Sequence, residues 1–297
     1  MVLPRTRIAL VFALAGLALA IPAQAQIEDN LSSYGDANAE GYLQPLKDAI
    51  GSALGDGLYP AGAIPLEGVH FRFSLQAMLV SFGDDDRTFK AATEPGFPDP
   101  QEVEVSTVVG SPDATIVTDT GSGAQFAFPG GFDLARFGVA VPQITVAGFG
   151  GNEATLRYLA FDVGDDEIGD VSFFGIGGRH DISQHFEDLP VRVAAMLFYQ
   201  KISFGEDLID HSVLSFGVQG SKRFEYVEPY AALGLNSSAM TVTYENSSGA
   251  NIDLDFDRDN QFDLALGNVF HLGLLRLNGE IHISDQISYA FGFSVGN

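Results

Sequence analysis

The chain has 297 residues, of which 46% are hydrophobic, so it can bury a sizeable core and a disordered chain is excluded. It carries 39 acidic residues against 15 Lys and Arg, and the formal net charge of −24 excludes a nucleic acid as partner. Cysteine is absent, which excludes disulfides, thiolate metal sites and a lipoprotein anchor on an N-terminal thiol.

The first 25 residues have the pattern of a secretory signal peptide. Arg5 and Arg7 precede an apolar run, and Ala23 and Ala25 occupy the small positions of a cleavage site. The run is shorter than the ~20 residues that cross a bilayer as a helix, so cleavage is favoured over a transmembrane anchor. We therefore expect residues 1–25 to be removed during export from a Gram-negative cytoplasm.

Residues 26–67 form a separate N-terminal segment. Pro45 suits the first turn of a helix and Gly55 suits its end. The apolar face of this predicted helix consists of Leu46, Ala49, Ile50, Ala53 and Leu54. A helix of about ten residues is marginal alone and must pack this face against another element. We expect it either to plug the lumen of a barrel or to cap the periplasmic end.

From residue 68 to residue 297 apolar side chains recur at every second position, which is the pattern of β-strands. The last strand shows it most clearly, with Ile287, Tyr289, Phe291, Phe293 and Val295 alternating with Ser288, Ala290, Gly292 and Ser294. This spacing predicts an all-β, antiparallel transmembrane barrel of about 12 to 14 strands, in which the last strand pairs with the first.

The connections between the predicted strands differ in length and charge. The segments "EYVEP", "HLG" and "SDQ" are short and are assigned to the periplasm, whereas "GDDDRTFKAATEPGFPDPQE" and "ENSSGANIDLDFDRD" are long, acidic and assigned to the outside. A secreted acidic β-sandwich remains an alternative, because the same alternation could face a protein core.

Five polar residues on the predicted strands are candidates for the lumen. They are His70, Arg72, Gln76, Arg157 and Arg192. Arginines in an acidic lumen would pair with carboxylates or contact an anionic group of a substrate, and structural pairing is the favoured role.

Two clusters suggest more specific chemistry. The segment "RHD" at 179–181, with Ser183 and His185, could form a hydrolase site, but a polar turn at the rim of a barrel is favoured. The row "DLDFDRD" begins like a calcium loop, yet Arg258 and Leu264 occupy the positions that need Gly and Glu. We therefore expect no catalytic residue, no metal site and no cofactor.

Several longer motifs occur in a fixed order, among them "GYLQPLKDAIGSALGDGLY", "PQITVAGFGGNEATLRYL" and "FFGIGGRHDI". With these motifs the chain resembles an uncharacterised family of bacterial outer-membrane proteins, known only as a domain of unknown function. It is more loosely similar to the long-chain fatty-acid channels of the outer membrane, which combine a larger barrel with an N-terminal hatch. The resemblance implies a barrel topology and no activity, and the last strand resembles the signal that the barrel assembly machinery recognises.

These observations favour an outer-membrane barrel that acts as a passive channel for small or hydrophobic solutes, constricted by the N-terminal helix. Its expected partners are the outer-membrane bilayer and the assembly machinery. A structural or binding barrel without transport is the alternative, and the two differ in the conductance that they predict.

Overall fold

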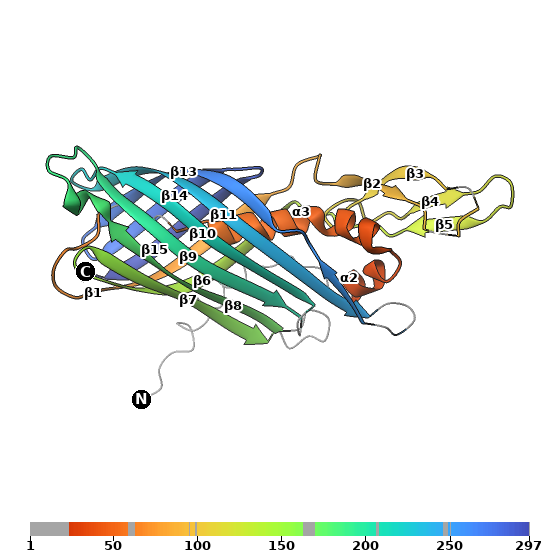
Figure 1. The fold of residues 1–297 in the computed structure, drawn as a ribbon, viewed down its shortest axis with the longest axis horizontal. Coiled ribbons are helices and arrows are strands. Elements are labelled where there is room, and N and C mark those ends of the chain that lie inside the picture. Colours follow the sequence, from red (N-terminus) through yellow and green to blue (C-terminus); the bar gives the residue numbers. More distant parts are fainter. Residues whose placement is uncertain are drawn as a thin grey trace, which may run out of the picture.

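The computed structural model describes residues 24–58, 63–94, 96–98, 100–162, 170–205, 208–245, 249 and 251–296. The expected signal peptide lies outside the described residues, apart from Gln24 and Ala25, with which the first described helix begins. The described part consists of a barrel, N-terminal helices and an extension of short strands beyond one end of the barrel (Figure 1).

In the described part of the chain, ten antiparallel strands form the barrel. They are hydrogen-bonded in the order β10, β9, β8, β7, β6, β1, β15, β14, β13 and β11, and a further pairing of β10 with β11 closes the sheet. Their bounds are β1 (His70–Ser81), β6 (Arg136–Ala147), β7 (Asn152–Asp162), β8 (Asp170–Asp181), β9 (Arg192–Phe204), β10 (Ile209–Ser221), β11 (Val227–Glu245), β13 (Asp259–Leu272), β14 (Leu275–Ile283) and β15 (Ile287–Gly296). The expected antiparallel barrel is confirmed.

The last strand pairs with the first, as the alternation predicts. Phe73 lies opposite Val295, and Leu79 lies opposite Tyr289 in the β1–β15 register. This pairing leaves no free edge between the two strands, which a sheet in lipid requires because no water is available to its backbone groups.

The barrel has fewer strands than the 12 to 14 expected. The described residues between 82 and 135 instead form the extension, whose strands are β2 (Thr88–Ala92), β3 (Glu102–Ser106), β4 (Thr115–Thr118) and β5 (Gln125–Phe128). These strands pair only as β2 with β3 and β4 with β5 among the described residues. With four or five residues each they are too short to span a membrane, which takes about 9 to 11 residues.

The two ends of the barrel differ. At the end that we call the extension end, residues 82–135 connect β1 to β6, and residues 246–258, which include the short strand β12 (Asn251–Asp255), connect β11 to β13. At the other end, which we call the C-terminal end, β15 ends and the connections 148–151 and 273–274 are short. Grouping "SDQ" with "EYVEP" and "HLG" is wrong, because the single strand β14 separates "HLG" from "SDQ" and carries the chain to the opposite end.

Side chains alternate between the outer and inner surfaces of the barrel. On β1, Phe71 and Phe73 are 59% and 58% exposed, whereas Ser74 and Gln76 are 1% exposed. The last strand repeats the pattern, with exposed Ile287, Phe291, Phe293 and Val295 and buried Ser288, Ala290 and Ser294. Because the closed sheet satisfies its own backbone groups, this apolar outer surface is suited to contact with lipid.

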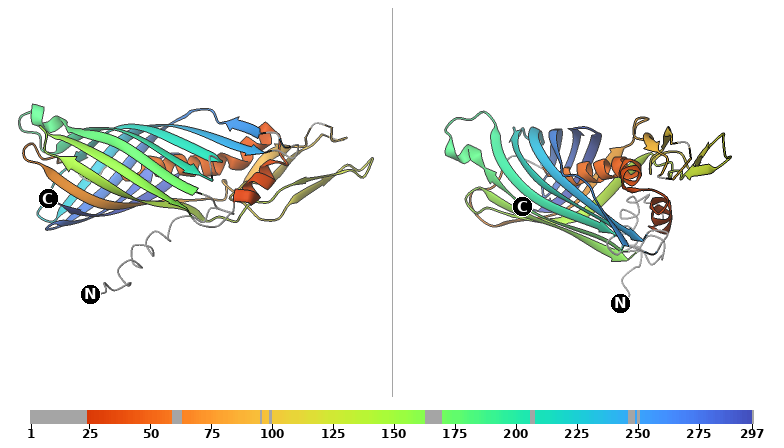
Figure 2. Two further views of the ribbon diagram at one scale, coloured as in Figure 1. Left: turned by 90° about the horizontal axis from the view of Figure 1, so that it is seen from below. Right: turned by 45° about the vertical axis from the view of Figure 1, so that its right-hand side comes forward.

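The described N-terminal helices are α2 (Gln24–Leu31) and α3 (Asp36–Gly55). Helix α2 lies at the extension end, and α3 runs from there into the barrel (Figure 2). Neither described helix has the length and apolar composition needed to cross a membrane.

The predicted start of the helix at Pro45 is wrong, because α3 begins at Asp36 and holds Pro45 in its interior. An interior proline removes one helical hydrogen bond and its ring crowds the carbonyl four residues earlier, here that of Gly41. The extension adds a contact in the same turn, since the backbone N–H of Val108 donates to the carbonyl of Tyr42 at 2.9 Å. Tertiary packing therefore maintains a helix that local sequence would interrupt.

The extension is packed on the helices. Asn38 Nδ2 donates to the carbonyl of Ala92 at 2.8 Å, and the ring of Tyr34 lies 6.4 Å from that of Phe89. A Cβ atom at Gly41 would lie 2.4 Å from the Phe89 ring, so only glycine allows this approach. The helices, the extension and the adjoining barrel wall share one hydrophobic core.

Candidate functional site: the barrel interior

Helix α3 fills the barrel interior from the extension end. Its predicted apolar face, Leu46, Ala49, Ile50, Ala53 and Leu54, is at most 2% exposed. The helix contacts β1, β6, β10 and β11. It approaches the wall so closely that a Cβ atom at Gly51 would lie 3.5 Å from Ser238 Oγ, and one at Gly55 would overlap the Asn236 amide.

Arg157 on β7 joins the end of α3 to one side of the wall. Its guanidinium donates to the carbonyl of Asp56 at 3.2 Å and to that of Gly57. It also donates to the side-chain oxygens of Gln143 and Gln200, both at 2.9 Å. Gly57 has a positive φ of 69°, which favours glycine and turns two successive carbonyls toward this arginine. The side chain is 1% exposed, so the guanidinium is enclosed by these partners.

The carboxylate of Asp56 joins α3 to the other side of the wall. His282 Nδ1 lies 3.1 Å from Asp56 and 2.8 Å from Asp263, while its Nε2 lies 3.2 Å from Glu280. Tyr230 donates to Glu280 at 2.6 Å. The short segment after α3 is therefore held from both sides at the middle of the lumen.

A second buried group lies nearer the C-terminal end, where Glu153 is shared by two arginines. Arg72 donates to it at 2.9 Å and Arg179 at 2.7 Å, and Arg179 also donates to Gln219 at 3.0 Å. The three charged residues are at most 8% exposed. Both arginines therefore pair with a carboxylate, which is the arrangement that the sequence favours for arginines in the lumen.

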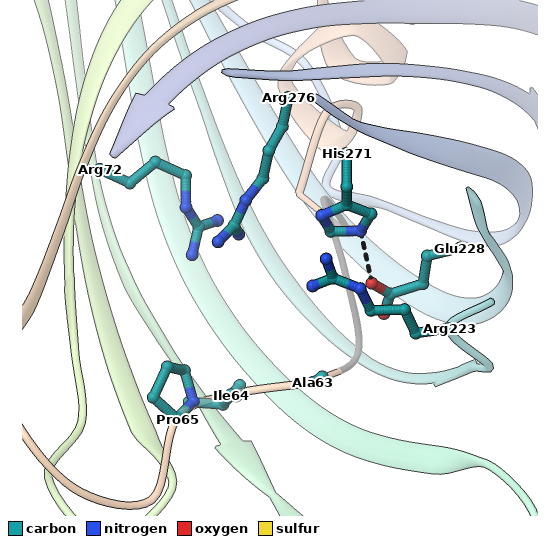
Figure 3. A pocket seen from close by; sticks show the side chains of 8 residues that line it. All are labelled: Ala63, Ile64, Pro65, Arg72, Arg223, Glu228, His271 and Arg276. Atoms are coloured by element: carbon teal, nitrogen blue, oxygen red, sulfur yellow. Dashed lines mark hydrogen bonds and ion pairs between the residues drawn. The ribbon is translucent and has the colours of Figure 1, made fainter. Parts of the chain in front are cut away.

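A cavity of about 230 Å³ lies at the C-terminal end of the interior (Figure 3). Its lining consists of Ala63, Ile64, Pro65, Arg72, Arg223, Glu228, His271 and Arg276. Glu228 accepts hydrogen bonds from Ser221 at 2.7 Å and from His271 Nε2 at 2.9 Å. The three arginines of the lining come from β1, from β14 and from the connection after β10.

The five predicted lumen residues do not form one group. Arg72 and Arg157 belong to the two groups above, and the amide of Gln76 pairs with that of Asn278 at 3.3 Å. His70 is half-buried at the C-terminal end, where its Nε2 lies 3.0 Å from the carbonyl of Glu67. Arg192, also at that end, is half-exposed and pairs with Asp181. A role of these residues toward a solute stays a prediction.

The residues considered for a hydrolase lie at the C-terminal end, around the 3₁₀-helix Ile182–His185. Ser183 Oγ accepts from the backbone N–H of Val193 and donates to its carbonyl. His180 and His185 stack with their Nε2 atoms 2.9 Å apart, and no described contact joins either ring to Ser183. These side chains therefore do not form a catalytic triad in this arrangement.

The acidic row at 253–259 lies at the extension end. Asp253 and Asp255 on β12 accept hydrogen bonds from Thr243 and Thr241, at 2.9 and 2.8 Å. No group of three or more His, Cys, Asp or Glu side chains within the described ranges could hold a metal ion. The expectation of no metal site stays a prediction.

Most of the buried charged residues are not among the five lumen residues predicted from the sequence. Glu153 stands four residues before Arg157, so the alternation of the strand predicts that both lie on the same face. The clearest unused signal is the segment "RLNGEIHI", in which Arg276, Asn278, Glu280 and His282 alternate with apolar residues. Four polar residues at period two predict a polar lumen face as directly as apolar residues predict a lipid face.

Residues 5–297 match the model of a family of unknown function (DUF6588). No curated protein is detectably similar to the chain.

Several solved structures are similar in outline. The outer-membrane protease OmpT of Escherichia coli is 8% identical, with a TM-score of 0.35 over 79% of this chain and 97% of that chain. The outer-membrane protein OmpT of Vibrio cholerae, as a loop-deletion mutant, is 12% identical, with a TM-score of 0.28 over 77% and 99% of the chains. The toluene transporter TbuX of Ralstonia pickettii is 10% identical, with a TM-score of 0.25 over 77% and 89%. At these scores the similarities carry no argument about function.

Proposed function

The chain belongs to a family of unknown function (DUF6588), and we propose that this member is an outer-membrane barrel that is closed at rest and holds its extension at one membrane face. The barrel serves as an anchor, and the extension is the part available to a partner. The observation that carries this proposal is the position of α3, which occupies the lumen and is fastened at its end to two sides of the wall.

The fastening in the lumen supports a closed barrel. Arg157 donates to carbonyls of Asp56 and Gly57, and the Asp56 carboxylate reaches His282 across the interior. Opening a passage would leave these buried charged groups without partners, and each such loss costs about 3 to 5 kcal/mol. A passive channel would have to break this connection in every open state.

The packing of α3 on the extension supports the anchoring role. The same helix contacts the barrel wall through Ile50 and the extension through Asn38 and Gly41. Moving the helix out of the lumen would therefore also separate the extension from its support. In this proposal α3 stays in the lumen because the extension depends on it for support.

The long connections suggest the orientation. Outer-membrane barrels place short turns in the periplasm and long loops outside. The extension end, with connections 82–135 and 246–258, is accordingly proposed to face the exterior, and the C-terminal end to face the periplasm. Assembly by the barrel assembly machinery is part of this proposal.

Planar-bilayer conductance of the detergent-folded full chain tests the proposal. We expect no conductance steps from the natural protein. The variant Ile50→Asp, which places a charge between α3 and the wall, should give steps because it loosens the helix. This variant shows that the assay can detect an unfilled lumen, and retained resistance to cold dodecyl sulfate shows that its barrel is folded.

A disulfide cross-link tests whether α3 stays fixed in the lumen or moves as a gate. The natural chain has no cysteine. The double variant Gly51→Cys/Ser238→Cys can therefore form a single disulfide, which joins α3 to β11. We expect no conductance in either the oxidised or the reduced form. Conductance that appears on reduction and disappears on oxidation would make α3 a gate and establish the passive channel instead.

A further inference from the structure

The cavity at the C-terminal end has a charge opposite to that of the whole chain. The chain carries a formal net charge of −24, yet Arg72, Arg223 and Arg276 all line this cavity, against one carboxylate, Glu228. With His271 neutral, the lining carries a formal charge of +2, from three arginines and one glutamate. Such a concentration of positive charge in an acidic protein requires a specific explanation.

The donors of this cavity are not used up by protein partners. Arg72 is 8% exposed, and its Nε is buried without a hydrogen-bond partner, although its Nη2 pairs with Glu153. The side chains of Arg223, which is exposed, and Arg276, which is half-buried, form no hydrogen bond or ion pair with any residue that the structure describes. Because the buried Nε of Arg72 lacks an acceptor, an acceptor in the cavity would satisfy this donor and recover free energy.

Among the described residues, the carboxylate of the lining forms its ion pair with His271 and none with these arginines. Glu228 is turned toward Ser221 and His271, both within 2.9 Å, and is 1% exposed. Figure 3 shows the side chains of Arg72 and Arg276 on one side of the cavity and that of Arg223 on another. Three guanidinium groups thus border a common space, and the donors of Arg223 and Arg276 and the Nε of Arg72 are available there.

We propose that this cavity binds a small anion that carries a phosphate group. Guanidinium groups match phosphate oxygens with paired hydrogen bonds, and three of them match the three outer oxygens of a phosphate monoester. A formal charge of +2 suits the dianion. The apolar side of the cavity, formed by Ala63, Ile64 and Pro65, leaves room for the organic group of a monoester.

Isothermal titration calorimetry of the detergent-folded full chain, at pH 8 and fixed ionic strength, tests the proposal. The probes are inorganic phosphate, phenyl phosphate, a short-chain phosphatidic acid and succinate. We expect saturable binding of the phosphate-bearing probes and at least tenfold weaker binding of succinate. Tighter binding of phosphatidic acid than of phenyl phosphate would identify a lipid headgroup as the source, and the reverse would identify a free metabolite.

Two arginine variants and a matched control complete the test. Arg223→Gln and Arg276→Gln should each weaken phosphate binding at least tenfold, because each removes one guanidinium from the lining. Lys222→Gln removes a charge next to Arg223 that does not line the cavity, and it should leave binding unchanged.

The proposal is overturned if the natural chain binds no phosphate probe, if both arginine variants bind like the natural chain, or if Lys222→Gln weakens binding equally. Cold resistance to dodecyl sulfate confirms the fold of each variant. The outcome is independent of the conductance test, because a closed or an open lumen could hold this anion at its C-terminal end.

Discussion

Glu153 is the single residue on which the C-terminal half of the interior most depends. Its carboxylate is 4% exposed and pairs with Arg72 and Arg179. The variant Glu153→Gln would leave two buried guanidinium groups facing a neutral amide. Breaking a buried ion pair from one side costs about 3 to 5 kcal/mol, and we expect a loss of this size in urea unfolding of the bilayer-folded protein.

A matched control is available on the extension. Glu102→Gln changes the same group at an exposed position of β3, and its effect should stay within about 0.5 kcal/mol. Equal unfolding free energies of the natural chain and Glu153→Gln would show that the cluster contributes no net stability.

Single residues were predicted from the sequence only where they follow a strand period. Arg72, Gln76 and Arg157 stand on the inner face because the apolar residues beside them face outward. Their partners could not be predicted, since Glu153 is 81 residues from Arg72 and the pairing depends on which strands are neighbours. The alternation identifies the face of a residue, whereas the register of a sheet identifies its contacts.

At the scale of elements, the apolar face of α3 tests how firmly the helix is packed. Ile50 is 1% exposed within the core shared with the wall. Ile50→Ala removes methyl groups from this core, and we expect a loss of about 2 to 5 kcal/mol in the free energy of unfolding. The matched variant Ile116→Ala, at a side chain that is 61% exposed on β4, should change it by less than about 0.5 kcal/mol.

Gly41 tests the contact between α3 and the extension. An alanine Cβ would lie 2.4 Å from the Phe89 ring, so Gly41→Ala should displace the extension although alanine favours the helix. We expect faster cleavage within residues 82–135 in limited proteolysis. Adding Phe89→Ala should restore much of the protection, because it removes the overlapping ring. Unchanged cleavage in Gly41→Ala would show that the helix does not support the extension.

The type of each element was more predictable than its bounds. The long strands follow from period-two alternation over more than ten residues, which few other structures produce. The helix was predicted too short because Pro45 is typical of a first helical turn, whereas in α3 the residues on both sides of it pack into the shared core. The extension could not be recognised as separate, because its strands have the same alternation as the wall but half the length.

At the scale of the whole molecule, closure of the ten-stranded sheet predicts resistance to detergent. The detergent-extracted protein should migrate faster in dodecyl sulfate electrophoresis before boiling than after it, because every strand of the barrel is paired on both sides. Absence of a mobility shift, together with solubility in water without detergent, would favour the secreted β-sandwich and remove the basis of the membrane assignment.

The segment that contains α3 adds one crossing of the barrel to the ten crossings made by the strands. The ten strands return the chain to the end at which they start, but the segment before β1 has already passed through the lumen from the other end. Ile27 and Gly296 accordingly lie at opposite ends of the barrel, because the chain crosses it an odd number of times. A finished cylinder could not be threaded by a helix that is packed on the extension. We therefore expect the β1–β15 seam to close around a helix that is already in place.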